Sequence, residues 1–357
     1  MNRVGAFLFL ARCLRRDDRA ALGRVDWTRV VEIASEHWMT LALYHALADK
    51  RVLDTLPSDL VEYFEYLHEA NLARNQGILE HVAEIAVLLN EIGVEPLLLK
   101  GACNLASGLY PDPAARFLYD IDILVPEDRS LECWRHLLSS GYRRIPNEDC
   151  PEDLPVPEWP ALIREERTAE LEMHRIGEWH DMLGSPELYA NTLPVALPRG
   201  NARMLDPTGR LIFAMAHAFV HHRQPFRATA NLRDLYDATL LLQKYGAQID
   251  WPRVIHAFES AGEMTALRRG FLIWRRFFGQ NPPCAVDSPA RVALYWPRCL
   301  LHIAKPQLAT IWNLLEMNWN VRDLRRSLLR PSVIRRKLRF AAGIWGRPSV
   351  ADPVKEK

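Results

Sequence analysis

The hydrophobic period of the chain changes near Gly93, and this change constrains the fold more than any other feature. Over residues 27–92 apolar side chains recur every three or four positions, which predicts amphipathic helices that end at Gly93. Residues 94–100 and 117–125 are instead short apolar runs bounded by turn residues, a pattern typical of strands. The helical period returns after Pro207. The sequence therefore predicts a region of mixed strands and helices between two helical regions.

Composition excludes several classes of protein. The 357 residues include 45 basic and 44 acidic side chains, a formal net charge of +1, which excludes a globally basic nucleic-acid coat or an acidic tail protein. A hydrophobic content of 49% and a charged content of 25% describe a globular chain, and the length suggests two or three domains. The six cysteines lie far apart with no C-x-x-C pair, so neither a disulfide framework nor a structural zinc site is expected.

The N-terminal apolar patch, residues 4–11, is too short for a signal peptide and is followed at once by arginines. No run approaches the roughly 18 apolar residues that a membrane span needs. These two features predict a cytoplasmic protein.

The expected fold class is α+β, with a small mixed β-sheet in a head between an N-terminal helical region and a C-terminal helical domain. The predicted boundaries are 1–93, 94–204 and 205–345, followed by a flexible tail, 346–357. Within the head the pattern reads strand, helix, strand, helix, and residues 168–174 form a third strand. The acidic, proline-rich residues 147–160 read as a loop or an insertion.

Two carboxylates share one face of the predicted strand 117–125. Because side chains alternate along a strand, Asp120 and Asp122 point the same way. They would repel each other unless a cation lay between them, and hard oxygen ligands favour Mg²⁺ or Mn²⁺. The alternative is a solvated pair on an edge strand.

The third predicted strand repeats this geometry with Glu170, Glu172 and His174 on one face. If it pairs beside the first, Glu172 supplies a third carboxylate, although Glu170 shares its face and a surface salt bridge explains either residue. Three carboxylates can hold two metal ions for an in-line phosphoryl displacement. His174 then orients a carboxylate or the nucleotide, or is a partly buried histidine with satisfied hydrogen bonds.

The junction between Lys100 and Gly101 suits binding of a phosphate. Glycine lets the backbone approach an anion closely, and the N–H groups that open a helix attract it. Lys100 and Arg116 are candidate contacts for a triphosphate. Alternatively, both pair with Asp120, Asp122 or Glu172 in a structural network.

Three other patterns have weaker chemical meaning. His217 and His221 have the spacing of a metal pair but lack the glutamate of a zinc protease motif. Asp234 and Asp237 lie three apart on a predicted helix, where surface or capping roles are expected and the alternative is that both face the cleft. Residues 322–339 hold eight basic side chains against one acidic, which suits contact with RNA or an anionic membrane, or a solvated helix folded back on the body.

One segment carries a family resemblance, the run LLLKGACNLASGLYPDPAARFLYDIDILV. With its helical flanks, over roughly residues 27–279, it resembles the uncharacterised bacterial nucleotidyltransferase family within the DNA polymerase beta-like superfamily. The resemblance implies a nucleotidyltransferase head and assigns site residues by motif: Asp120 and Asp122 as the metal pair, Glu172 as the third carboxylate, Gly101 as the phosphate-loop glycine, and Lys100 and Arg116 as basic motif residues.

These inferences together predict an enzyme that transfers a nucleoside monophosphate from an NTP to an acceptor hydroxyl with release of pyrophosphate, using Mg²⁺ or Mn²⁺. The acceptor stays open among a small molecule, a protein and RNA. One alternative is a catalytically silent nucleotide-binding or interaction protein that keeps the fold. The other is an adaptor that binds RNA or a membrane surface through residues 322–339.

Overall fold

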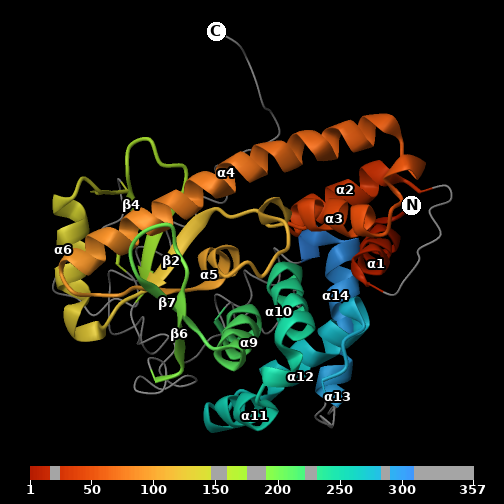
Figure 1. The fold of residues 1–357 in the computed structure, drawn as a ribbon. Helices are drawn as coiled ribbons and strands as arrows, with labels where there is room; N and C mark the ends of the chain where they lie inside the picture. Colours follow the sequence, from red (N-terminus) through yellow and green to blue (C-terminus); the bar gives the residue numbers. More distant parts are fainter. Residues whose placement is uncertain (17–24, 146–158, 175–189, 222–230, 283–289, 309–357) are drawn as a thin grey trace.

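The fold is a seven-stranded mixed sheet with helices packed around it (Figure 1). The computed structural model describes residues 1–16, 25–145, 159–174, 190–221, 231–282 and 290–308. The predicted α+β class with a mixed sheet is confirmed. Most of the predicted loop 147–160, the basic segment 322–339 and the tail 346–357 lie outside the described residues.

The sheet has the strand order β3-β4-β5-β2-β1-β7-β6. At its centre β2 pairs in parallel with β5 and antiparallel with β1, and β1 pairs in parallel with β7. The outer pairs β3–β4, β4–β5 and β6–β7 are antiparallel. The bounds of the strands are β1 Leu97–Leu98, β2 Asp120–Leu124, β3 Arg143–Arg144, β4 Leu162–Ile163, β5 Glu170–His174, β6 Thr192–Val195 and β7 Ala202–Leu205.

Helices precede, interrupt and follow the sheet, as the change of period predicts. The α-helices are α1 Arg3–Leu14, α2 Trp27–Glu36, α3 Thr40–Asp49, α4 Ser58–Glu91, α5 Lys100–Ala106, α6 Ser130–Ser139, α9 Pro207–Ala216, α10 Leu232–Tyr245, α11 Trp251–Ser260, α12 Met264–Ile273, α13 Ala290–Ala293 and α14 Tyr295–Ala304. Short turns that matter below are the 3₁₀ turns η2 Pro113–Ala115 and η3 Glu127–Arg129 and the π turn η5 His217–His221.

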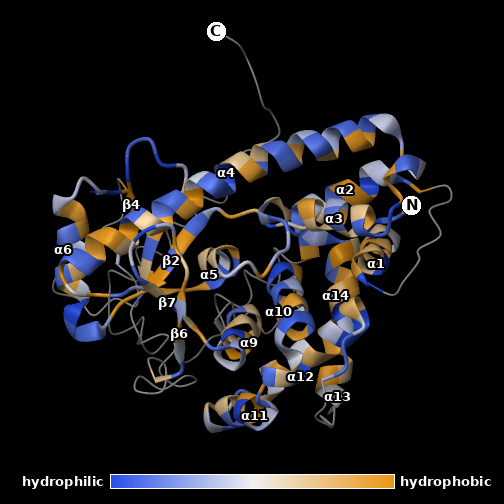
Figure 2. Cartoon of the chain, in the orientation of Figure 1, coloured by the Kyte–Doolittle hydropathy of each residue, from blue (hydrophilic) through white to orange (hydrophobic). Residues whose placement is uncertain are grey.

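Helix α4 joins the two halves of the molecule. Its 34 residues begin after Pro57 and end before Gly93, whose φ of 73° lets the chain turn back. In Figure 1 this helix runs past both the N-terminal helices and the sheet, and Figure 2 shows hydrophilic and hydrophobic residues alternating along it. Phe64 packs in the core of the helical half, whereas Ile78 packs in the core under the sheet. The position of the sheet against the helices therefore depends on α4.

The N-terminal and C-terminal helices share one hydrophobic core. Buried residues of α1, α2 and α3 belong to the same cluster as those of α9 to α12 and α14. Phe7 of α1 packs on Phe277, with ring centroids 4.7 Å apart, and Arg15 Nε donates to the carbonyl of Phe277 at 2.9 Å. The helices before residue 93 and those after residue 204, which the predicted boundaries assign to different regions, are therefore packed together in one core.

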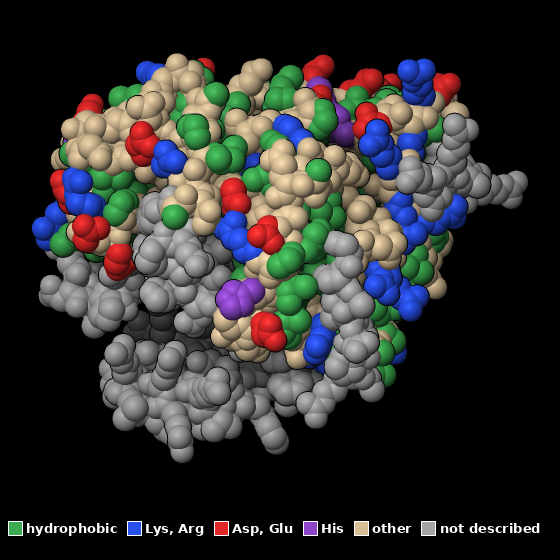
Figure 3. Space-filling view, turned by 60° about the horizontal axis from the view of Figure 1, so that its bottom comes forward, with side chains coloured by type: hydrophobic (Ala, Val, Ile, Leu, Met, Phe, Trp, Pro, Cys, Tyr) green, Lys and Arg blue, Asp and Glu red, His purple; other side chains and the backbone are tan. Residues whose placement is uncertain are grey.

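The surface of the described residues carries both signs of charge. On the face shown in Figure 3, basic and acidic side chains lie interspersed with hydrophobic ones, as the near-zero net charge leads us to expect. Among the described helices, none has both the length and the apolar character that crossing a membrane requires.

Candidate functional site

The register of β2 against β5 brings the predicted carboxylates together. Asp120 lies opposite Glu170, and Asp122 lies opposite Glu172. Because alternate residues of a strand share a face and these strands are parallel neighbours, all four carboxylates and His174 lie on the same face of the sheet. The pairing of these two strands, which the sequence required if Glu172 was to be a third carboxylate beside Asp120 and Asp122, is thus present in the structure.

Asp122 is the centre of the site and is fully buried. Its Oδ1 accepts hydrogen bonds from Lys100 Nζ at 2.5 Å and from His174 Nε2 at 2.7 Å. Burial alone would raise the pKa of Asp122, but the charge of Lys100 and the hydrogen bond from His174 outweigh it and lower that pKa. Asp122 is therefore ionised, and Nε2 of His174 must carry the proton that it donates.

The neighbouring carboxylates are harder to ionise. Burial and the negative charge of Asp122 raise the pKa of Glu172 to about 7. The same two causes raise the pKa of Asp120, against the attraction of Lys100 and of Arg233 on α10. Near neutral pH Asp122 is therefore firmly ionised, whereas Glu172 is only partly ionised and gains its full charge if a cation binds beside it.

The donor set fits a divalent cation. Oδ2 of Asp122 is buried and has no hydrogen-bond partner among the described residues. Asp122, Glu172 and His174 each offer a ligand atom, and these atoms lie within 4.8 Å of one another. Because His174 Nε2 already donates to Asp122, the oxygens of Asp122 and Glu172 are the available ligands and His174 orients Asp122. Oxygen donors in this number suit Mg²⁺ or Mn²⁺.

Lys100 reaches Asp122 from a strained backbone position. It is the first residue of α5 and has a φ of 41°, in the left-handed region that residues other than glycine rarely adopt. Leu99, the residue before it, is bound to β2, because the Leu99 N–H donates to the Asp122 carbonyl at 3.0 Å. Such strain costs on the order of 1–3 kcal/mol and persists where surrounding contacts impose it, often at functional sites.

Gly101 allows a buried arginine to pass close to the backbone. A Cβ at this position would lie 2.3 Å from Arg116 Nη1 and 3.1 Å from Leu118 Cγ. The role of Gly101 as a phosphate-loop residue stays a prediction. The structure supplies a packing reason for glycine here.

Replacing Gly101 by Ala is expected to lower the free energy of unfolding by about 1–3 kcal/mol. The added Cβ would have to displace the side chain of Arg116, which is hydrogen-bonded to Asp237. Urea denaturation of the purified variant measures this loss. The matched control is Gly77→Ala in α4, where a Cβ would meet nothing within 4 Å and the gain in helix propensity is about 0.5–1 kcal/mol. Equal stability of the two variants would contradict the steric argument.

Arg116 pairs with a partner that the sequence does not indicate. Its side chain is 6% exposed, and Nε and Nη2 donate to the carboxylate of Asp237 on α10 at 2.9–3.1 Å. Tyr110 Oη donates to the same carboxylate at 2.5 Å. Arg116 thus belongs to a structural network, as the alternative prediction had it. Its partner is Asp237 and not the expected Asp120, Asp122 or Glu172. Contact between Arg116 and a nucleotide stays a prediction.

The surface role expected for Asp234 and Asp237 is wrong, whereas Asp234 does have a capping role. The N-cap residue of α10, Asn231, accepts the Asp234 N–H and donates through Nδ2 to Asp234 Oδ2 at 2.7 Å. Both side chains are buried, and Asp234 Oδ2 lies 2.6 Å from His217 Nδ1. Their spacing of three on an amphipathic helix was the only signal that could have placed them inward. Together with Lys100 they line a cavity of about 30 Å³ between the sheet and the helices.

The fold and the site define an α+β protein whose mixed sheet carries a D-x-D strand and a third carboxylate beside a Lys-Gly turn. The family model described as "Uncharacterised nucleotidyltransferase" matches residues 23–279, and the chain belongs to this family. The predicted resemblance to an uncharacterised nucleotidyltransferase family is confirmed over nearly the predicted range.

The chain is also similar to a solved structure, an antigenic nucleotidyltransferase-like protein from Paracoccidioides brasiliensis. The two share 14% sequence identity with a TM-score of 0.37, over 57% of this chain and 94% of that chain. No curated protein matches the chain.

Proposed function

We propose that this protein is a metal-dependent nucleotidyltransferase that moves a nucleoside monophosphate from an NTP to an acceptor hydroxyl and releases pyrophosphate. The observation that carries the proposal is the buried, ionised Asp122, whose Oδ2 has no partner among the described residues and lies beside Glu172 on the neighbouring parallel strand. Membership of the nucleotidyltransferase family supports it.

Each side chain of the site has a distinct part in this proposal. A divalent cation bound there would neutralise the triphosphate oxygens and the leaving pyrophosphate. Lys100 and His174 hold Asp122 in one orientation through its Oδ1, which leaves Oδ2 directed to a cation. Glu172 completes the set when it loses its proton, and Asp120 adds negative charge at the exposed end of the strand.

Arg233 is a further basic residue that we include in the proposed site. It is half-buried on α10. Its positive charge opposes the rise that burial and Asp122 cause in the pKa of Asp120, and it adds to the effect of His217 in lowering the pKa of Asp234. Asp237 holds Arg116, and Asp122 holds Lys100. Of the two arginines, Arg233 is therefore better placed than Arg116 to contact the triphosphate. We assign Arg116 to positioning the turn that precedes β2.

The test uses each of the four NTPs labelled at the α-phosphate, incubated with purified protein, Mg²⁺ and a whole-cell extract. We expect label to pass to one class of acceptor, with pyrophosphate released in equal amount and with EDTA preventing both. Calorimetry on the same preparation measures NTP binding. Tight NTP binding without transfer of label from any NTP would instead identify a silent nucleotide-binding protein.

A further inference from the structure

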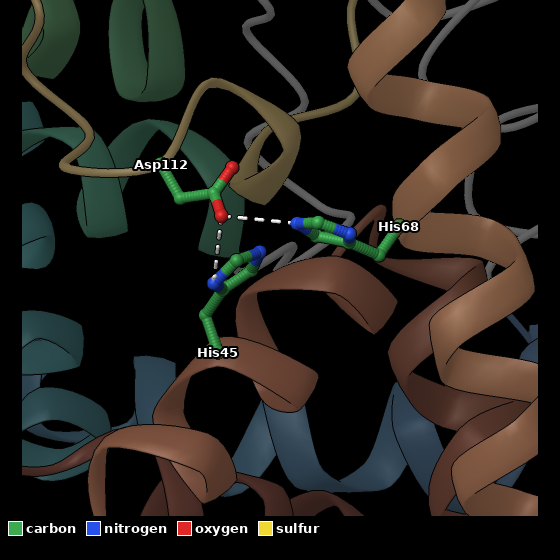
Figure 4. A group of neighbouring side chains, drawn as sticks. All are labelled: His45, His68 and Asp112. Carbon is green, nitrogen blue, oxygen red and sulfur yellow. Dashed lines mark hydrogen bonds and ion pairs between the residues drawn. The ribbon is translucent and has the colours of Figure 1, made fainter.

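Three side chains of types that bind metal ions come together from separate elements, none of them part of the acidic cluster. His45 lies on α3, His68 lies on α4, and Asp112 is the N-cap of η2. Oδ2 of Asp112 is 3.0 Å from His68 Nε2 and 3.9 Å from His45 Nδ1. Figure 4 shows both rings directed at this one oxygen. All three ligand atoms lie within 4.8 Å of one another.

Within the described structure, His45 makes no hydrogen bond through either ring nitrogen. Nδ1 is too far from Asp112 for a hydrogen bond, and Nε2 is buried without a partner among the described residues. A neutral imidazole leaves one ring nitrogen with a lone pair, which is the form in which histidine binds a metal ion. A cation between Nδ1 and the carboxylate would give this buried ring the partner that it lacks.

The carboxylate of Asp112 is held in place through its other oxygen. Oδ1 accepts the N–H of Ala114 at 2.8 Å, which fixes the orientation of the carboxylate. The remaining oxygen, Oδ2, is left facing the two imidazoles.

An ion can reach this group and keep an open position there. The side chains of His45, His68 and Asp112 are 18%, 22% and 38% exposed. His45 and Asp112 also line a cavity of about 1180 Å³, which leaves room for water or another small ligand. This arrangement differs from a closed site with four protein ligands.

We propose that His45, His68 and Asp112 bind one Zn²⁺ ion. On binding, His68 would take the tautomer with its proton on Nδ1, so that Nε2 exchanges its hydrogen bond with Asp112 for a bond to the metal. Two imidazoles and a carboxylate are a common ligand set for zinc, whereas Mg²⁺ prefers oxygen alone. Bonds of about 2.0 Å in a tetrahedron place ligand atoms about 3.3 Å apart, close to the 3.0 Å and 3.9 Å separations from Asp112 Oδ2. A small movement of the His45 side chain would complete the geometry.

The ion would fasten the turn that leads to the acidic cluster. Asn71 and Asn75 lie on the same face of α4 as His68 and donate to the carbonyls of Ala114 and Arg116 at 2.8 Å each. A metal ion would replace the existing hydrogen bond between His68 and Asp112 by two metal bonds and, through His45, would join α3 to the same ion. The proposal does not depend on the proposed transfer reaction.

The experiment measures Zn²⁺ binding to untagged protein stripped with a chelator. The Asp122→Asn variant serves as the parent, because it removes the most strongly ionised ligand of the acidic cluster. Titration against a chromogenic zinc chelator is expected to give one site with affinity at least about 100-fold weaker after His68→Gln. Replacing Zn²⁺ by Co²⁺ is expected to give the visible absorption of a four-coordinate ion, lost in the same variant.

The control is His136→Gln. His136 Nε2 lies 3.2 Å from Glu91 Oε2, an equivalent pair for which the described structure offers no third ligand, so zinc affinity should not change. If His68→Gln fails to fold by circular dichroism, Asp112→Asn replaces it, because asparagine keeps an oxygen that can accept the Ala114 N–H. Equal zinc affinity in the parent and in the folded cluster variant, or an equal loss in the control, would overturn the proposal.

Discussion

Replacing Asp122 by Asn is expected to reduce Mg²⁺-dependent NTP turnover by on the order of 10³-fold or more, or about 4 kcal/mol of transition-state stabilisation. Asparagine keeps the shape of the side chain but removes the one carboxylate charge that Lys100 and His174 maintain. Without that charge, a cation would have only Glu172 and Asp120, whose pKa values are raised, to bind. Release of pyrophosphate under saturating NTP measures the loss.

Two further variants separate loss of chemistry from loss of fold. Asp128→Asn in η3 changes an exposed carboxylate and is expected to leave both turnover and stability unchanged. Asp120→Asn removes a less buried carboxylate of the same strand and should also abolish turnover while disturbing packing less. Undiminished turnover in both Asp120→Asn and Asp122→Asn, with each protein folded by circular dichroism, would eliminate the mechanism.

The carboxylate pattern could be predicted from the sequence because its geometry is local. Side chains alternate along each of the two five-residue strands, so the sequence fixes which of them share a face. The apolar residues that alternate with the carboxylates in each strand fix which face packs inward. The same reasoning could not separate Glu172 from Glu170. The pairing of the two strands separates them, since Glu172 lies opposite Asp122 and within ligand distance of it, whereas Glu170 lies opposite Asp120.

The partners of the basic residues could not be predicted, because they depend on contacts between distant elements. Arg116 and Asp237 are 121 residues apart, and neither lies in a pattern that indicates a buried charge. His45, His68 and Asp112 likewise come from two helices and a turn, so no metal-site spacing appears in the sequence. Periodicity predicts the face of an element, but packing of one element on another decides which side chains meet.

Replacing Asp237 by Asn is expected to lower the free energy of unfolding by about 3–5 kcal/mol, the cost of breaking a buried ion pair by removing one partner. Arg116 would remain buried, 6% exposed, and a guanidinium cannot escape the cost by losing its charge. Tyr110 would also lose the charged acceptor of its hydroxyl proton. Urea denaturation followed by tryptophan fluorescence measures the change.

Two comparisons test whether burial of the charge causes this loss. Glu165→Gln breaks the pair between Arg143 and Glu165, whose side chains are 75% and 81% exposed, and should change stability by less than about 0.5 kcal/mol. The double variant Arg116→Met with Asp237→Leu removes both charges and should be more stable than either single variant, because no unpaired charge stays buried. If the double variant is the least stable of the three, the network acts through its hydrogen-bond geometry, and the electrostatic explanation fails.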